Sequence, residues 1–306
     1  MINIFGSLFV ILGTLLWAAD SLIRYPLLYS GVSASQIVFL EHTFLVIFVS
    51  GYFIINKNLL KLREILRKNY LEFIVIGVFG SALGTLSFTK AFELINPSLV
   101  IILQKFQPFV AFILAHFILG EKLKKDFIIY ASLAMIGGLL ISLPDIRSGL
   151  SINILSDVSQ STLFGYGLTL IAVISWGSST VFGKKLSLSG LNEIEIMSGR
   201  FIFGFIFMSI YVLSLGSMSS INTHVEIIFK VLMMVVISGV LGMFFYYKGL
   251  RLISSRMCAI AELFFPFCAV VINWIFLNKS LQPIQIFGGL ILISASLILQ
   301  LKKVKD

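Results

Sequence analysis

The residues best placed to do chemistry in this 306-residue chain are ionisable side chains inside long apolar segments. Glu262 lies one helical turn before Pro266 in such a segment. Placing a carboxylate in the membrane interior costs at least a few kcal/mol, so residues of this kind are usually functional. We expect Glu262 to carry a proton or to bind a cationic group of a substrate. A carboxyl group that only forms a hydrogen bond to a neighbouring helix is the alternative.

A second polar group occupies an equivalent apolar segment earlier in the chain. Gln104, Lys105 and Gln107 lie within one helical turn, and three such side chains are not expected to face lipid. We hypothesise that Lys105 binds a substrate carboxylate while Glu262 binds an amino group or a proton. A simple buried ion pair between Lys105 and Glu262 is the alternative.

Two prolines and two tryptophans occupy corresponding places in the same segments. Pro108 and Pro266 each remove a helical hydrogen bond, which predicts a hinge in each helix. Prolines that a membrane helix merely tolerates are the alternative. Trp17 and Trp176 suit a cavity wall, where they could stack on an aromatic or cationic group of a substrate. Packing between helices is the alternative for both.

Charged residues nearer the ends of the apolar segments predict two gates whose ion pairs close alternately. The residues assigned to the outer gate are Asp20, Arg24, Glu41 and Lys90. Those assigned to the inner gate are Arg200 and Lys248, with Glu193 and Glu195 nearby. We expect Glu41 to pair with Lys90. For Lys90 and Lys248 the alternative is a side chain that extends to the lipid headgroups.

The composition indicates the elements that must position these residues. Hydrophobic residues make up 58% of the chain, charged residues 12%, and the mean hydropathy is +1.03. Soluble domains carry about 25% charged residues, so a soluble enzyme and a disordered chain are excluded. Apolar segments of about 20 residues predict an all-α membrane protein with ten transmembrane helices. The expected helices are 4–24, 34–55, 71–91, 97–119, 127–143, 164–183, 194–214, 230–250, 256–277 and 283–301.

The basic residues predict the orientation of these helices. Fifteen of the 23 Lys and Arg residues lie in segments on the side of the N-terminus, and four lie in segments on the other side. Because Lys and Arg are enriched in cytoplasmic loops, we expect both termini to be cytoplasmic in a bacterial inner (plasma) membrane. The net charge of +9 then reflects orientation and does not indicate a nucleic-acid partner.

The two halves of the chain are related in sequence. A shift of 159 residues pairs Trp17 with Trp176, and a shift of 158 pairs Pro108 with Pro266. Five helices per half is an odd number, so the second half enters the membrane from the opposite side. The sequence therefore predicts two inverted five-helix repeats, at 1–143 and 164–306, joined by a linker at 144–163. Such repeats allow alternating access to a central site, as in secondary transporters.

Several segments of the chain are similar to one known family. Residues 90–98 (KAFELINPS), 107–109 (QPF) and 117–123 (FILGEKL) resemble the signature of EamA-type drug/metabolite transporters. The resemblance implies a ten-helix exporter or exchanger whose cavity is lined mainly by helices 1, 3, 4, 6, 8 and 9. Similar proteins move amino acids, other small metabolites or drugs, often coupled to protons. Gln107 stands where such proteins usually carry an acidic residue.

These observations predict a secondary transporter of small organic solutes, most consistent with a proton-coupled exporter or exchanger of amino acids or related metabolites. A multidrug exporter of hydrophobic cations is one alternative, and a non-transporting membrane scaffold or receptor is another. The sequence contains no nucleotide-binding glycine loop, metal-ligand spacing or nucleophile–base arrangement. We therefore expect no enzymatic activity, no cofactor, no metal and no obligate protein partner. The expected partners are a small-molecule substrate and the lipid bilayer.

Overall fold

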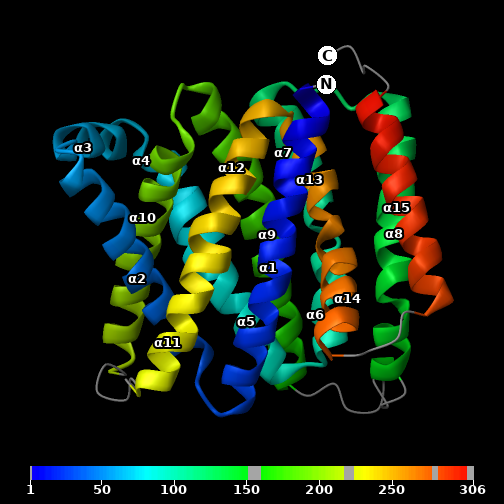
Figure 1. Ribbon diagram of the computed structural model, residues 1–306, viewed down its shortest axis with the longest axis horizontal. Coiled ribbons are helices and arrows are strands. Elements are labelled where there is room, and N and C mark those ends of the chain that lie inside the picture. The colour runs from blue at the N-terminus through cyan, green and yellow to red at the C-terminus, as the bar shows by residue number, and fades with distance from the viewer. Residues whose placement is uncertain (1, 151–159, 217–223, 278–281, 302–306) are drawn as a thin grey trace.

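A computed structural model describes residues 2–150, 160–216, 224–277 and 282–301, which contain helices and no strands (Figure 1). The helices of the first half are α1 (Ile2–Tyr29), α2 (Ala34–Ile55), α3 (Leu59–Lys68), α4 (Tyr70–Phe73), the π-helix η1 (Ile74–Leu83), α5 (Gly84–Leu94), α6 (Pro97–Gln104), α7 (Gln107–Leu119) and α8 (Lys125–Leu150). Those of the second half are α9 (Gln160–Leu188), α10 (Glu193–Ser214), α11 (Val225–Met234), the π-helix η3 (Val235–Gly242), α12 (Met243–Leu252), α13 (Ser255–Glu262), α14 (Phe264–Leu277) and α15 (Pro283–Leu301).

The all-α membrane fold predicted from the sequence is confirmed. Within the described ranges, nine helical segments are long and apolar enough to cross a membrane. The tenth expected span is the interrupted pair α6 and α7. Several expected helices were too short: α1 continues to Tyr29, α8 continues to Leu150 through Pro144, and α9 runs from Gln160 to Leu188. Arg24 does not end α1, because Asp20 neutralises its charge one turn earlier. Residues 151–159 of the expected linker lie outside the described residues.

The fourth and ninth spans are broken at equivalent places. The first piece of the fourth span ends at Gln104, and the first piece of the ninth ends at Glu262. A proline removes the hydrogen bond to the carbonyl group four residues earlier, which is Gln104 for Pro108 and Glu262 for Pro266. The prolines therefore account for both breaks and place a polar side chain at each. That these breaks act as hinges stays a prediction.

The third and eighth spans each contain a π-helical segment, η1 and η3. The sequence pattern did not predict these wider turns. Such segments are rare and often occur at functional sites. Their backbone carbonyl groups at the repeat-related residues Gly80 and Ser238 accept hydrogen bonds from Arg200 and Trp17.

The two halves are interlocked. Helix α1 packs against η3, α12, α13 and α14, whereas α9 packs against η1, α5, α6 and α7. Each half thus inserts its first helix between the third and fourth spans of the other half. Glycine allows this close approach at matching places: Gly6 lies against Ile253, and Gly165 lies against Ile95. Helices α8 and α15 pack along each other at one edge of the bundle (Figure 1).

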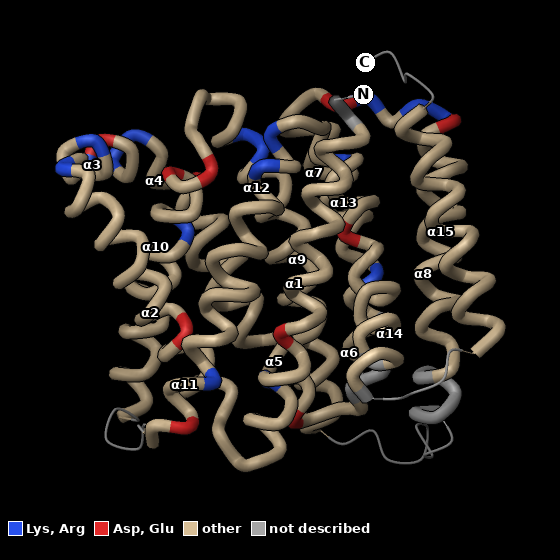
Figure 2. Tube along the Cα trace, viewed as in Figure 1, with Lys and Arg blue, Asp and Glu red and all other residues tan. Residues whose placement is uncertain are grey.

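The bundle has two chemically different ends. We call the end where α1 begins and α15 ends the N-terminal face, and the other end the opposite face (Figure 1). Figure 2 shows that Lys and Arg residues gather at the N-terminal face, where α3 lies across the end of the bundle. This arrangement is the one that the predicted cytoplasmic orientation of the N-terminus requires.

Candidate functional site

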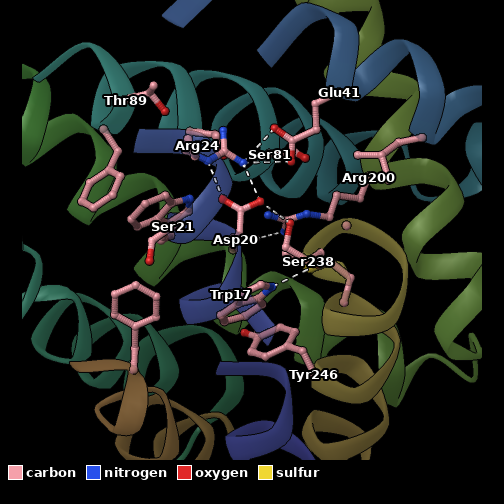
Figure 3. Close-up of a pocket in the computed structure, with 18 of the residues that line it drawn as sticks. Trp17, Asp20, Ser21, Arg24, Glu41, Ser81, Thr89, Arg200, Ser238 and Tyr246 are labelled. Carbon is pink, nitrogen blue, oxygen red and sulfur yellow. Dashed lines mark hydrogen bonds and ion pairs between the residues drawn. The ribbon is translucent and has the colours of Figure 1, made fainter. Parts of the chain in front are cut away.

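The interlocked halves line a partly open cavity of about 190 Å³ (Figure 3). Its lining includes residues from the first, third, fourth, sixth, eighth and ninth spans, as the resemblance implied. Residues of α2 and α10 also line it, among them Glu41, His42 and Arg200. On α1 the lining runs from Trp17 to Tyr25, the half of that helix nearer the opposite face.

Two pairs of aromatic rings line the cavity at repeat-related positions. Trp17 contacts Tyr246 with ring centroids 5.1 Å apart, and Trp176 contacts Phe88 with centroids 4.8 Å apart. A shift of 159 residues relates the tryptophans, and a shift of 158 relates Phe88 to Tyr246. All four residues line the cavity. The cavity therefore offers flat apolar surfaces from both halves of the chain.

Asp20, Arg24 and Glu41 form a buried ion cluster on one wall of the cavity (Figure 3). Arg24 Nε donates to Asp20 Oδ2 at 2.6 Å, and Arg24 Nη2 lies 3.1 Å from Glu41 Oε2. Ser238 Oγ donates to the other oxygen of Asp20 at 2.7 Å. One guanidinium thus binds two carboxylates and offsets one of their two negative charges, and a hydroxyl group from the second half completes the cluster.

The expected pairing of Glu41 with Lys90 is not present. Glu41 binds Arg24, and Lys90 forms no ion pair within the described ranges. Arg24 reaches α2 because its side chain extends from the turn after Asp20. The sequence pattern placed the two cations Arg24 and Lys90 on the same side of the membrane, but it could not show which of them faces Glu41.

Arg200 lines the cavity without a carboxylate partner in the part of the chain that the structure describes. It is 4% exposed, and its nitrogens donate to Ser179 Oγ at 2.6 Å, Tyr247 Oη at 3.3 Å and the Gly80 carbonyl oxygen at 3.0 Å. Every acceptor is neutral. A buried guanidinium with neutral partners leaves a positive potential at the cavity wall.

The inner gate predicted around Arg200 is therefore wrong in its pairing. Glu195 binds Lys61 at 2.6 Å and caps the first turn of α10, and Glu193 lies 3.6 Å from Arg251. Lys248 lies over the rings of two phenylalanines, with its Nζ 4.7 Å from the centroid of Phe9. The two glutamates turn toward the N-terminal face because the start of α10 needs a cap and surface cations are nearby.

Glu262 accepts hydrogen bonds at the break between α13 and α14. Its carboxylate oxygens accept hydrogen bonds from the side-chain amide of Gln107, from the hydroxyl groups of Thr180 and Tyr246 at 3.0 Å each, and from the Cys258 thiol at 3.6 Å. The donors come from four helices of both halves. Thr180 and Tyr246 were not predicted as site residues. The one signal in the sequence for Tyr246 is that it corresponds to the aromatic residue Phe88 in the first repeat.

Lys105 lies apart from this cluster. It is 4% exposed, does not line the cavity, and places its Nζ 6.0 Å from the ring centroid of Phe265. No ion pair between Lys105 and Glu262 forms in the structure. Gln104 and Gln107 do line the cavity. The polar turn expected to bind substrate as a unit is split, because the helix break at residues 105–106 turns Lys105 away from its two neighbours.

A tight set of contacts closes the bundle toward the N-terminal face. Glu121 lies 3.0 Å from Arg256 Nε and also accepts from the backbone and side chain of Ser255 at 2.9 Å. Lys185 pairs with Glu72 at 2.8 Å. Glu121 belongs to the segment 117–123 that resembles the family signature, and its position at the start of α13 explains what an acidic side chain does there.

The fold and the cavity define an α-helical membrane transporter for small solutes, built from two interlocked inverted five-helix repeats. The chain belongs to the EamA-like transporter family, whose sequence profile matches residues 4–143 and 163–301. This match confirms the family predicted from the sequence. It also favours a transporter over an enzyme.

Related proteins are also named as transporters. The chain is 31% identical over 299 residues to the riboflavin transporter ImpX of Fusobacterium nucleatum subsp. nucleatum, covering 95% of this chain and 96% of that protein. It is 23% identical over 267 residues to the uncharacterized transporter YoaV of Bacillus subtilis, covering 87% and 84%. A solved crystal structure shares the fold, with a TM-score of 0.71 at 12% identity and 96% coverage of each chain.

Proposed function

We propose that the protein transports riboflavin or a similar planar, hydroxylated heteroaromatic solute across a bacterial inner membrane, with both termini in the cytoplasm. The observation that carries the proposal is the pair of aromatic contacts, Trp17 with Tyr246 and Trp176 with Phe88, on the cavity wall. Flat ring systems bind between such side chains with offset or tilted stacking. The relative named as a riboflavin transporter supports the same substrate class.

Polar atoms around the cavity supply the other half of this recognition. The riboflavin ring system carries carbonyl oxygens and an imide N–H on one edge, and its side chain carries hydroxyl groups. Four buried polar atoms on residues of the cavity lining lack a hydrogen-bond partner: Arg24 Nη1, Thr89 Oγ1, Gln104 Oε1 and Arg200 Nε. An unsatisfied buried polar atom costs about 1–3 kcal/mol, which small side-chain movements toward a bound solute would recover. The set contains both donors and acceptors, as such a solute requires.

Alternating access between the two faces is the proposed mechanism. The cavity extends along α1 toward the opposite face, and the contacts of Glu121 with Arg256 close the N-terminal face. Inverted repeats exchange these roles when one half adopts the conformation of the other. We propose that the breaks at Pro108 and Pro266 absorb the bending within the repeats at 1–143 and 164–306.

Glu262 is the proposed proton carrier. A carboxylate accepts all four hydrogen bonds that its neighbours offer, whereas a protonated carboxyl group must donate one. Protonation would therefore rearrange the contact between Gln107 and Glu262, which joins the two broken spans. If Glu262→Gln transported with the full pH dependence of the wild type, this role would be excluded.

Proton-coupled export of amino acids is the second candidate. The observation in its favour is that Arg200 and Glu262 line the same cavity without forming an ion pair to another described side chain. An amino acid could place its carboxylate on Arg200 and its ammonium group on Glu262. This arrangement replaces the expected contact of a carboxylate with Lys105.

Substrate flux in proteoliposomes tests the proposal. Labelled riboflavin and a panel of labelled amino acids are offered separately, with and without a pH gradient. We expect riboflavin flux to fall at least tenfold in Trp17→Ala and Trp176→Ala. Trp274→Ala is the matched control, because Trp274 is 51% exposed and does not line the cavity. Flux of amino acids alone would replace the first candidate by the second, and no flux of either class would reject both.

A further inference from the structure

Helix α3 is the one helix longer than a single turn that lies across the bundle instead of along it, within the described residues (Figure 1). It follows α2 at the N-terminal face, outside the membrane-spanning segments. The sequence pattern placed residues 57–68 in a basic loop and did not predict a helix there. No step of the proposed transport cycle uses it.

One face of α3 packs against the bundle. Leu62 is 7% exposed, and Ile65 and Leu66 pack against the buried core. The spacing of three and four residues places these side chains on one side of a helix. The inward face is therefore satisfied by the protein itself.

The remaining surface of α3 combines basic and apolar side chains. Lys57, Arg63, Arg67 and Lys68 are exposed, and Leu59 and Leu60 are 52% and 82% exposed. Residues 57–68 hold five Lys or Arg residues and one Glu, a net charge of +4. Figure 2 shows this cluster at the level where the spanning helices end. An exposed basic and apolar helix at that level lies where lipid headgroups meet acyl chains.

We propose that α3 and the preceding Lys57 form a binding site for anionic phospholipid headgroups. The basic side chains bind the lipid phosphates, and Leu59 and Leu60 enter the boundary between headgroups and acyl chains. Charge complementarity supports this ligand, because anionic lipids attract clusters of four or more basic residues next to membrane helices. A zwitterionic headgroup offers no net charge to the cluster.

A specific contact connects this site to the transport domain. Lys61 Nζ lies 2.6 Å from Glu195 Oε1, and this contact raises the pKa of Lys61. Glu195 also accepts from the backbone N–H of Asn192 in the capping box of α10. Because α10 carries Arg200, lipid that holds α3 in place also restrains a helix of the cavity wall.

Lipid retention by the full-length protein tests the proposal. The protein in detergent is titrated with phosphatidylglycerol or phosphatidylcholine, and bound lipid is counted by native mass spectrometry. The test variant carries Lys57→Gln, Arg63→Gln and Arg67→Gln and leaves Lys61 in place. The matched control carries Lys122→Gln, Lys124→Gln and Lys125→Gln, which removes the same charge next to the start of α8 at the N-terminal face (Figure 1).

We expect the wild type and the control to retain phosphatidylglycerol in preference to phosphatidylcholine. The test variant should lose affinity for phosphatidylglycerol by about tenfold or more, since each basic residue near an anionic surface contributes roughly a fivefold effect. Equal losses in both triple variants would show a general charge effect and overturn the proposal. Equal retention of the two lipids by the wild type would overturn it as well. Circular dichroism of the test variant confirms that the helical fold is retained before the comparison is made.

Discussion

The two repeats carry opposite charges at the same backbone position of the cavity. Glu41 of α2 corresponds to Arg200 of α10 after a shift of 159 residues, and Asp20 of α1 corresponds to Ser179 of α9. In the first repeat, Arg24 forms ion pairs with both Asp20 and Glu41. In the second repeat, Arg200 binds Ser179 and other neutral acceptors.

This difference shows that the repeat preserved the backbone and not the electrostatics. The aromatic contacts remained symmetric, because Trp17 with Tyr246 and Trp176 with Phe88 need only similar shapes. The charged positions diverged, so one wall of the cavity holds two carboxylates around one guanidinium and the other holds a guanidinium with neutral partners. We expect such a cavity to distinguish the two ends of a bound solute.

The largest effect is expected from removing the cation of the first repeat. Arg24→Gln leaves Asp20 and Glu41 buried without a positive charge, which should cost about 3–5 kcal/mol of unfolding free energy. Thermal unfolding in detergent measures the loss. Adding Glu41→Gln to Arg24→Gln should recover part of it, because one unpaired carboxylate is then removed.

The same substitution in the second repeat provides the comparison. Arg200→Gln removes hydrogen bonds but leaves no carboxylate unpaired in the described structure, so its effect on unfolding should be smaller, about 1–2 kcal/mol. Transport should nevertheless fall, because the unpaired guanidinium of the cavity wall is gone. Equal destabilisation by Arg24→Gln and Arg200→Gln would mean that the two sites are electrostatically alike after all.

The sequence predicted which residues are buried and charged but not which of them meet. Hydropathy located the spans, and the prolines located the two breaks, because both signals are local. The partner of Glu41 depends on how α1 and α2 pack, and Arg24 and Lys90 looked equivalent without that information. For Lys105 the sequence predicted a contact that does not form. Its spacing from Gln104 and Gln107 indicated that the three side chains share one helix face, but this holds only for an unbroken helix.

The second largest effect concerns the carboxyl group at the second break. Glu262→Gln replaces a carboxylate oxygen by an amide NH₂ among Gln107, Thr180 and Tyr246, so at least one of these donors must turn and accept instead. We expect transport to fall at least tenfold, with loss of its dependence on a pH gradient, in a proteoliposome flux assay. The double variant Glu262→Gln with Gln104→Glu should not recover, because Phe88 stands where Tyr246 donates. Recovery would show that the two breaks are interchangeable.

A smaller effect is expected where the repeats are most alike. Gly6→Ala would bring a methyl group within 2.5 Å of Ile253, and Gly165→Ala would bring one within 2.6 Å of Ile95. Each should lower the unfolding free energy by about 1 kcal/mol, the cost of overpacking offset in part by better helix propensity. Gly167→Ala is the control, because no atom lies within 4 Å of the added group. Differential scanning fluorimetry should give similar decreases in the unfolding temperature for the first two variants and a small increase for the third, which gains helix propensity without overpacking.

The smallest effect is expected from copying one residue of the first repeat into the second. Tyr246→Phe reproduces Phe88 and keeps the ring contact with Trp17, but it removes one donor to Glu262. We expect transport to fall about threefold with little change in substrate affinity, because Gln107, Thr180 and Cys258 still donate to Glu262 and offset part of the lost hydrogen bond. A large loss of affinity measured by equilibrium binding would instead assign the hydroxyl group to the substrate.

Helix α3 and the capping role of Glu121 show a second limit of the sequence. The basic side chains of residues 57–68 indicate the orientation of the chain, whereas the amphipathic helix that they belong to becomes evident only in the structure. Glu121 was visible as part of a familiar motif, but its acceptance of the Ser255 and Arg256 backbone N–H groups needs α7 and α13 to meet across the two halves. The sequence pattern of a single chain does not show which distant segments come into contact.

The exchange of first helices between the halves has a consequence for synthesis. Helix α1 is made first, yet it packs against α12 and α14, which leave the ribosome about 200 residues later. Until then the polar residues Asp20 and Arg24 have as partners each other and Glu41 of the next helix, with Ser238 still to come. The intrahelical ion pair thus serves the nascent chain before it serves the cavity. A gene cut between the halves should yield a folded protein only when both fragments are made together.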